Sequence, residues 1–132
     1  MGKGCLQVNV YKDNGTQIVA EVRFTSETGG EKGRKPEAYS CIPPGPLAEL
    51  ARVFGYGASK YSLHNWAKGY PYSWSIDALQ RHIEAWRSGE NKDPESGLHH
   101  LGHAMFHLLV LQEFESTNTG TDDRLCTMRK KQ

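Results

Sequence analysis

Histidines and carboxylates gather between residues 82 and 103 of this 132-residue chain. Eight such residues fall in the stretch: His82, Glu84, Glu90, Asp93, Glu95, His99, His100 and His103. In helical bundles, imidazole and carboxylate groups on facing helices hold divalent metal ions. The offsets between His100, His103 and His107 also place these three side chains on one helical face. We therefore expect a metal-binding or polar catalytic site here.

Plainer roles stay open for some members of this cluster. Asp93 stands before Pro94, which is typical of the start of a helix, so its carboxylate could be only a helix cap. His107 lies beside Phe106 in an apolar run, where a hydrogen-bonded core histidine is the expected occupant.

Several familiar catalytic motifs are excluded. The run 99–103 has the paired histidines of a zinc-protease helix, but it carries His100 where the catalytic Glu should stand. The chain has no His-Asp dipeptide, which marks one class of phosphohydrolases, and neither a P-loop nor a Gly-x-Gly-x-x-Gly fingerprint. Metalloprotease, HD-type, P-loop and Rossmann interpretations are therefore set aside.

A second group of residues is basic and aromatic. Three cations share a glycine-rich stretch, namely Lys32, Arg34 and Lys35. Cations and backbone N–H groups in such a stretch could meet phosphates. The segment 57–72 then supplies a lysine, an amide and aromatic faces, including Lys60, Tyr61, Asn65 and Trp66. Aromatic faces and amides are the usual means of gripping a flat base, so this group indicates nucleotide binding.

The elements that must position these groups begin with a β-hairpin. Residues 6–10 and 17–24 alternate apolar and polar types, as half-buried strands do, and the Asp-Asn-Gly run at 13–15 favours a tight turn. Residues 25–45 are rich in proline and glycine, so no regular element is expected there.

Three helical patterns follow the hairpin. Apolar residues recur at helical spacing over 47–54, and Gly55 and Gly57 are expected to weaken or end that helix. A second helix is expected from Ser73 or Ser75 to Gly89, and a third over about 93–114. The third is apolar almost all round in its second half, which predicts a place at the centre of the core.

Composition bounds the remaining possibilities. The 16 Lys+Arg and 15 Asp+Glu residues leave a net charge of +1, which argues against binding of nucleic-acid strands. No apolar run approaches the roughly 18 residues that cross a bilayer, and no signal peptide is recognised, so we expect a cytoplasmic protein without membrane contact. Three widely spaced cysteines, Cys5, Cys41 and Cys126, are expected as free thiols. The polar composition after residue 115 predicts a frayed end.

Several short motifs, in a fixed order, resemble those of a known family. They are Thr28-Gly29-Gly30-x-Lys32-Gly33, Ile42-Pro43, Glu49-Leu50-Ala51-x-x-Phe54-Gly55-x-Gly57-Ala58-x-Lys60-Tyr61, Asn65-Trp66-x-x-Gly69-Tyr70, Ala78-Leu79-Gln80-Arg81-His82, Gly89-Glu90-x-x-Asp93-x-Glu95-x-Gly97 and His100-Leu101. Over about residues 26–124 this string resembles the phage dATP/dGTP diphosphohydrolases, which are similar to the MazG-like all-α nucleotide pyrophosphohydrolases.

The resemblance implies a mainly α fold, with a small MazG-like helical domain of three or more helices behind the hairpin. The resemblance covers the helical domain over 26–124, and the residue patterns add a β-hairpin extension over 1–25 and a basic tail over 125–132. The implied activity is hydrolysis of purine deoxynucleoside triphosphates to monophosphate and pyrophosphate with Mg²⁺ or Mn²⁺, in control of a phage nucleotide pool. The compartment would then be the host cytoplasm.

Carried over position by position, the resemblance also assigns residues. The implied catalytic residues are Glu90, Asp93 and His82. The implied metal ligands are Glu49, His82, Asp93 and His100, with His103 as a further member of the cluster. The nucleotide would be held by Lys32, Lys35, Lys60, Tyr61, Asn65, Trp66 and Arg81.

Two other functions stay open at this point. MazG-like enzymes show a Glu-x-x-Glu helix, whereas Glu49 is followed three positions later by Arg52. A non-catalytic binder that sequesters a host nucleotide signal would explain the missing carboxylate, and a structural zinc site in an interaction domain is the third possibility. MazG-like relatives assemble, so the resemblance also implies a homodimer or homotetramer.

Overall fold

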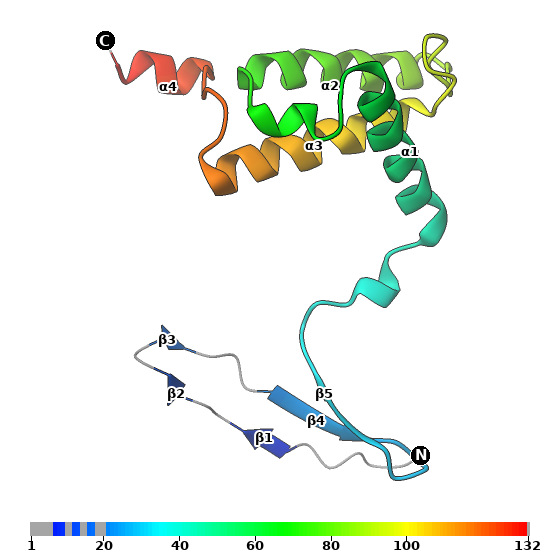
Figure 1. Cartoon of the computed structure of the whole chain (residues 1–132), viewed down its shortest axis with the longest axis vertical. Coiled ribbons are helices and arrows are strands. Elements are labelled where there is room, and N and C mark those ends of the chain that lie inside the picture. The colour runs from blue at the N-terminus through cyan, green and yellow to red at the C-terminus, as the bar shows by residue number, and fades with distance from the viewer. Residues whose placement is uncertain (1–6, 10–11, 14–15, 18–20, 132) are drawn as a thin grey trace. The chain divides into compact units, whose positions relative to one another are not determined.

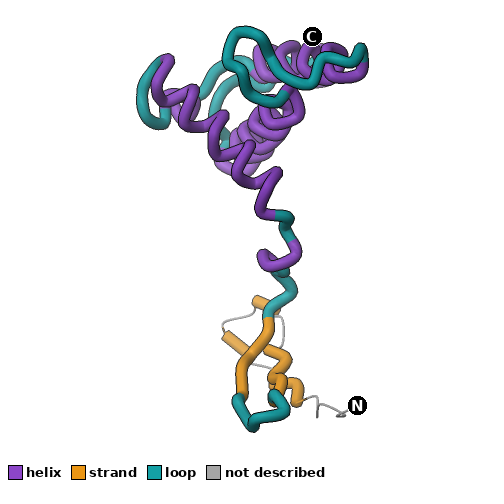
Figure 2. The backbone as a smooth tube through the Cα atoms, turned by 90° about the vertical axis from the view of Figure 1, so that its right-hand side faces the viewer, coloured by secondary structure: helices purple, strands orange, loops and turns teal. Residues whose placement is uncertain are grey.

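The protein is mainly α-helical, with an N-terminal β-hairpin, as the sequence predicts. The chain divides into two compact units, of which the first holds the strands and the second the four α-helices (Figures 1 and 2). These units are Met1–Ile42 and Pro43–Gln132. The structure, a computed structural model, describes residues 7–9, 12–13, 16–17 and 21–131.

The predicted N-terminal hairpin is confirmed. Strand β1 (Gln7–Asn9) pairs antiparallel with β4 (Glu21–Thr25). Farther along the same hairpin, β2 (Lys12–Asp13) pairs with β3 (Thr16–Gln17). The turn residues 14–15 lie outside the described part of the chain.

A further strand, β5 (Glu31–Arg34), pairs antiparallel with the other edge of β4. The expectation of no regular element over 25–45 was therefore wrong here. A tight turn brings β5 back onto β4, because the Ser26 hydroxyl accepts the Gly30 N–H at 2.9 Å. Gly29 takes a φ of +84°, which glycine adopts without the strain that a side chain would add.

Helix α1 (Pro44–Lys60) follows a short 3₁₀ turn, η1 (Tyr39–Cys41). It continues through Gly55 and Gly57, so the expectation that the helix would end at these glycines was wrong, whereas a weakening of the helix there stays a prediction. Each glycine costs about 1 kcal/mol in a helix interior. Burial of apolar side chains such as Val53, at about 1.5–3 kcal/mol each, outweighs that cost.

Helices α2 (Tyr72–Arg87) and α3 (His100–Thr117) lie side by side (Figure 1). The second predicted helix is therefore confirmed, but the third begins later than expected. Asp93 does not cap α3, because it opens a tight loop in which its N–H donates to the Leu98 carbonyl at 2.8 Å. Its own carbonyl accepts the Gly97 N–H at 2.7 Å.

The core forms where α1 and α2 pack on α3. Gly102 on α3 permits a close approach of α1, because a Cβ there would lie 3.3 Å from the Val53 side chain. Deeper in the unit, Val110 and Phe114 have no exposed surface. Partly buried apolar residues surround them, namely Phe54, Trp66, Tyr70, Ile76, Phe106 and Leu111. This packing confirms the predicted central place of α3.

The polar segment after α3 is ordered by hydrogen bonds rather than frayed. The Thr121 carbonyl accepts the Tyr72 N–H at 3.0 Å. The Asp123 carboxylate accepts the Ser73 N–H at 2.9 Å and so caps the start of α2 from fifty residues away. A short helix, α4 (Leu125–Arg129), follows.

Two simple sequence expectations concern thiols and membranes. Cys41 and Cys126 are free and exposed, and Cys5 lies outside the described residues. Among the described helices, none is long and apolar enough to span a bilayer.

Candidate functional site

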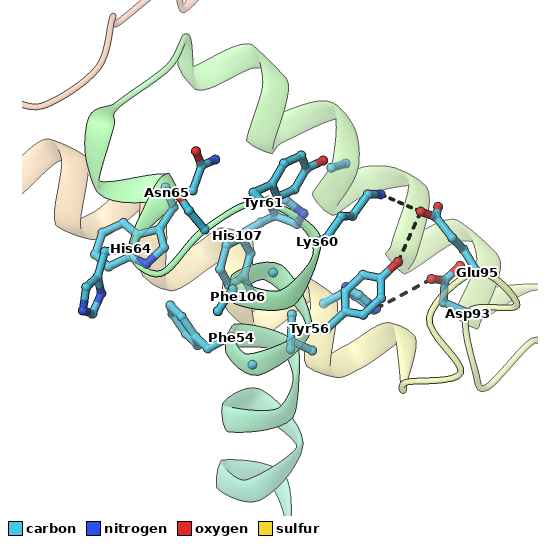
Figure 3. A pocket seen from close by; sticks show the side chains of 18 of the residues that line it. Phe54, Tyr56, Lys60, Tyr61, His64, Asn65, Asp93, Glu95, Phe106 and His107 are labelled. Carbon is cyan, nitrogen blue, oxygen red and sulfur yellow. Dashed lines mark hydrogen bonds and ion pairs between the residues drawn. The ribbon is translucent and has the colours of Figure 1, made fainter.

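A cavity of about 500 Å³ opens in the helical unit, between the end of α1, the segment after it, α2 and α3 (Figure 3). That segment contains a 3₁₀ helix, η2 (Asn65–Lys68). Five of the residues predicted to hold a nucleotide line the cavity: Lys60, Tyr61, Asn65, Trp66 and Arg81. The fold therefore gathers residues that are spread over more than twenty sequence positions.

One wall of the cavity is aromatic. Phe54 lies edge-on to Phe106, with ring centroids 4.8 Å apart, and edge-on to Trp66 at 6.1 Å. His107 continues the wall, with its centroid 5.1 Å from that of Phe106. Such a wall offers flat apolar faces to a planar ligand.

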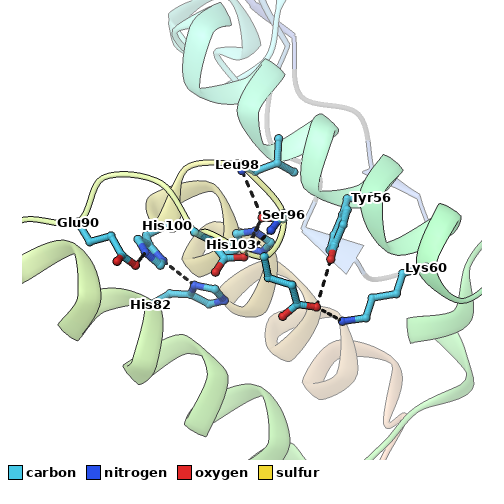
Figure 4. A network of polar contacts seen from close by, with 10 residues as sticks. Tyr56, Lys60, His82, Glu90, Ser96, Leu98, His100 and His103 are labelled. Carbon is cyan, nitrogen blue, oxygen red and sulfur yellow. Dashed lines mark hydrogen bonds and ion pairs between the residues drawn. The ribbon is translucent and has the colours of Figure 1, made fainter.

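The mouth of the cavity carries exposed charges. The Lys60 ammonium donates to Glu95 Oε1 at 2.5 Å, and the Tyr56 hydroxyl donates to the same oxygen at 3.3 Å (Figures 3 and 4). The hydrogen bond between Lys60 and Glu95 raises the pKa of Lys60 and lowers the pKa of Glu95. Both side chains are exposed, and solvent-exposed ion pairs of this kind are weak. An anionic ligand could therefore replace Glu95 as the partner of Lys60.

Histidines from α2 and α3 meet at the inner side of the cavity. His82 Nδ1 lies 2.9 Å from His100 Nδ1, and His100 Nε2 lies 2.7 Å from Glu90 Oε1 (Figure 4). His82 also stacks on His103, with centroids 4.5 Å apart and ring planes within 6°. His82 and His103 line the cavity, whereas His100 and Glu90 lie behind them.

A second hydrogen-bonded group joins α3 to the loop before it. Ser96 donates both its N–H and its hydroxyl to Asp93 Oδ2, at 3.1 and 2.8 Å. The Ser96 oxygen also lies 2.7 Å from His103 Nε2. Because the single Ser96 hydroxyl proton goes to Asp93, His103 Nε2–H is the donor in that contact. His103 Nδ1 is then unprotonated in the neutral ring.

Three of the histidines that line the cavity, His82, His103 and His107, are held in their neutral form at neutral pH. Burial, reinforced by the neighbouring imidazoles, lowers the pKa of His82 and of His107 to about 4. Burial also lowers the pKa of His103. Lys60 and Arg81 therefore supply positive charge for phosphates at this cavity, whereas these three histidines do not.

Asp93 is the ionised partner of this group. Partial burial raises the pKa of the Asp93 carboxyl, but hydrogen bonds from Ser96 and from backbone N–H groups outweigh that effect and leave the pKa below its ordinary value. The result is a negative charge on the cavity wall, next to neutral imidazoles.

The structure brings some predicted residues together and keeps others apart. Asp93, His82, His100 and His103 form one hydrogen-bonded and stacked assembly. Glu49 pairs instead with Arg52 at 2.6 Å on α1. Lys32 and Lys35 belong to the N-terminal unit, so their contact with a nucleotide stays a prediction.

The arrangement does not form a ready site for Mg²⁺ or Mn²⁺. In the part of the chain that the structure describes, no group of three or more His, Cys, Asp or Glu side chains is placed to hold a metal ion. The facing nitrogens of His82 and His100 are engaged with each other, and Asp93 Oδ2 is engaged by Ser96. Mg²⁺ moreover prefers oxygen ligands to imidazole. We therefore assign no chemical step to a resident metal.

Three residues of the site carry no motif in the sequence. Their partners lie 7 to 39 positions away: Tyr56 contacts Glu95, Ser96 contacts His103, and Ser75 Oγ lies 3.0 Å from His107 Nδ1. The sequence signals for this region were the cluster of histidines and carboxylates over 82–103 and the helical spacing of His100, His103 and His107, all three of which lie on α3.

Comparison with known proteins shows the family of this chain. Residues 26–124 match the family described as dATP/dGTP diphosphohydrolase, N-terminal. A dATP/dGTP diphosphohydrolase of Salmonella phage PMBT28 is 33% identical over 94 residues, which cover 71% of this chain and 31% of the phage protein. The chain thus spans about a third of that relative's length. No solved structure matches. The chain belongs to the family of dATP/dGTP diphosphohydrolase N-terminal domains.

Proposed function

We propose that the helical unit binds a purine deoxynucleoside triphosphate in the cavity and hydrolyses it to the monophosphate and pyrophosphate. The observation that carries the proposal is the cavity itself, in which an aromatic wall and a cationic mouth face the same space. Family membership supplies the substrate class, because the phage relative is named for dATP and dGTP.

The aromatic wall is suited to the base. Phe54, Trp66 and Phe106 present ring faces and edges at the inner end of the cavity. Stacking of a base on an aromatic side chain contributes about 1–3 kcal/mol and tolerates either purine. Asn65 adds a side-chain amide that can donate and accept hydrogen bonds.

The mouth is suited to the triphosphate. Lys60 would exchange its exposed contact with Glu95 for phosphate oxygens, and Arg81 would add a planar fork of donors. A divalent ion would arrive with the triphosphate, as part of the nucleotide chelate that serves as substrate. This role is consistent with the absence, among the described residues, of a protein group that could hold the ion alone.

The Asp93–Ser96–His103 group is suited to accept a proton. A water oxygen forms a bond to the α-phosphorus, the bond from the α-phosphorus to the bridging oxygen breaks, and pyrophosphate leaves. His103 Nδ1 accepts the water proton, while Asp93, through Ser96, stabilises the charge that develops on the imidazole. His82 stacks on His103 and holds its ring in place.

A direct assay tests this function. The purified chain is incubated with each of the four dNTPs and Mg²⁺ or Mn²⁺, and the products are separated by ion-exchange chromatography. We expect dAMP or dGMP together with pyrophosphate, and a loss of about 100-fold or more in kcat for His103→Gln. Asp77→Asn, which alters an exposed carboxylate outside the cavity, is the matched control and should leave kcat unchanged.

A second candidate function is nucleotide binding without hydrolysis. It is favoured by one observation: this chain spans only about a third of its phage relative, so catalytic groups could lie in the remainder of such a protein. Tight binding of dATP or dGTP with no product, in the same assay, would establish this second function and exclude the first. The structural-zinc alternative would instead require zinc that copurifies with the chain and whose removal unfolds it.

A further inference from the structure

A row of three polar side chains runs from beside the cavity into its wall. The Tyr70 hydroxyl lies 2.7 Å from Ser75 Oγ, and Ser75 Oγ lies 3.0 Å from His107 Nδ1. Ser75 has no exposed surface. None of these contacts serves the hydrolytic group described above, and His107 is the only member that lines the cavity, beside Phe106 (Figure 3).

The direction of these hydrogen bonds follows from counting protons. Ser75 has one hydroxyl proton and can give it either to Tyr70 or to His107. If Ser75 gave it to Tyr70, the phenol proton of Tyr70 would need another acceptor, and the described part of the chain offers none. Burial raises the pKa of Tyr70, so the phenol keeps that proton. The consistent order is Tyr70 to Ser75 to His107.

This order fixes the tautomer of His107. Its Nδ1 accepts from Ser75, so its Nε2 carries the proton of the neutral ring. Among the described residues, Nε2 of His107 has no hydrogen-bond partner, and no side-chain nitrogen or oxygen there is both buried and unpaired. Nε2 therefore keeps some exposed surface, and because His107 lines the cavity beside Phe106, we infer that this N–H is the donor the ring offers at the aromatic wall.

We propose that His107 is a base-recognition residue, whose Nε2–H donates to a ring nitrogen, N3 or N7, that adenine and guanine both leave unprotonated. Tyr70 and Ser75 are positioning residues that hold the required tautomer. Thymine has no unprotonated ring nitrogen, so this contact favours purines over thymine. The inference rests on the proposed binding of a purine nucleotide in this cavity and adds the atom by which the purine is read.

Deaza nucleotides test the contact atom by atom. Binding of dATP, 7-deaza-dATP and 3-deaza-dATP is measured by calorimetry with the wild-type chain and with His107→Phe, which keeps a flat ring but removes the donor. We expect one of the two analogues to bind the wild type about tenfold more weakly than dATP. His107→Phe should bind dATP and that analogue equally, because the variant has no Nε2–H to donate to the ring nitrogen that the analogue lacks.

The outcomes separate this inference from the function on which it rests. If dATP and dGTP do not bind at all, the proposed function fails and the inference fails with it. If both bind but neither deaza analogue binds more weakly, only the inference is overturned. His99→Phe, which removes an imidazole outside the cavity, is the matched control and should keep the discrimination.

The tautomer has its own signature. In the ¹⁵N spectrum of imidazole-labelled protein, His107 should show a protonated Nε2 and an unprotonated Nδ1. Tyr70→Phe keeps the ring packed against Phe114 but removes the phenol proton, so we expect mixed tautomers and a smaller effect of the deaza substitution, with the fold retained. A wild-type His107 that is protonated on Nδ1 would overturn the proposal even where nucleotide binding is intact.

Discussion

The inner side of the cavity and its mouth are both polar, but they hold their polar groups in different ways. Inside, the histidines are neutral, and His107 and His103 each have one nitrogen engaged by a serine. At the mouth, Lys60 and Glu95 are charged, exposed and paired mainly with each other. Buried polar groups must be satisfied by fixed partners, whereas exposed ions exchange partners with solvent or ligand at little cost. The inner side is therefore suited to recognising the shape and hydrogen-bonding atoms of a base, and the mouth to binding charged phosphates.

The largest effect should come from the packing that supports the inner side. Phe114 has no exposed surface and contacts the rings of Tyr70 and Tyr72. Phe114→Ala should lower the free energy of unfolding by about 3–5 kcal/mol, measured by urea denaturation. Leu125→Ala, at a largely exposed position on α4, should change it by less than about 0.5 kcal/mol. Equal losses at the two positions would contradict this account of the core.

As the pH falls, the fold should first lose the stability that depends on the neutral histidines of the inner side, before the ion pair at the mouth is affected. The folded pKa of His82 and of His107 is about 4, below the ordinary histidine value, so between about pH 6.5 and 4 the unfolded chain binds protons that the folded chain does not. The contribution of these two rings to the free energy of unfolding is therefore fully present above pH 6.5 and is lost as the pH drops to 4. The total loss is about 2–4 kcal/mol after allowance for the partial solvent screening of His82.

Denaturation at a series of pH values measures this loss. His107→Phe should flatten the curve between pH 6.5 and 4, because one of the two titrating groups is gone. A stability that is constant over this range would mean that the two rings are not buried in their neutral form.

Removing the cation at the mouth should affect binding and leave the fold intact. Lys60→Met should weaken dATP binding about five- to tenfold, because one charge-assisted contact to phosphate is lost. The melting temperature should move by only about 1 °C, since the ion pair with Glu95 is exposed. Weaker salt dependence of binding in the variant would identify the lost contact as electrostatic. A fall in melting temperature without a change in affinity would show the opposite division of roles.

The smallest effect should follow from removing the charge of Glu95, which competes with the phosphates for Lys60. Glu95→Gln leaves Lys60 without its carboxylate partner, so dATP should bind about two- to threefold more tightly at low ionic strength. Glu84→Gln, which alters an exposed carboxylate paired with Arg87 on α2, is the matched control. Weaker binding in Glu95→Gln would indicate that this carboxylate itself contacts the nucleotide.

Many residues of the cavity could be predicted from the sequence, but the hydrogen bonds and ion pairs that they form could not. The aromatic segment and the helical spacing of the histidines indicated a nucleotide site, and five of the named nucleotide residues line one cavity. The carboxylates were harder to place. Asp93 looked equally like a helix cap, and only the loop that closes on Leu98 decided that it faces Ser96 and His103. Glu49 belonged to the same motif string, but on α1 it forms an ion pair with Arg52, because residues three positions apart are neighbours on a helix surface.

The sequence by itself determined the hairpin, the helical majority and the family, since periodicity, turn residues and motif order are local properties of the chain. Tertiary structure alone decided where α3 begins, that α1 passes through its glycines, and that the end of the chain caps α2. It also decided which nitrogen of His107 carries the proton. That choice depends on Tyr70 and Ser75, and a tautomer is set by contacts in space rather than by neighbours in sequence.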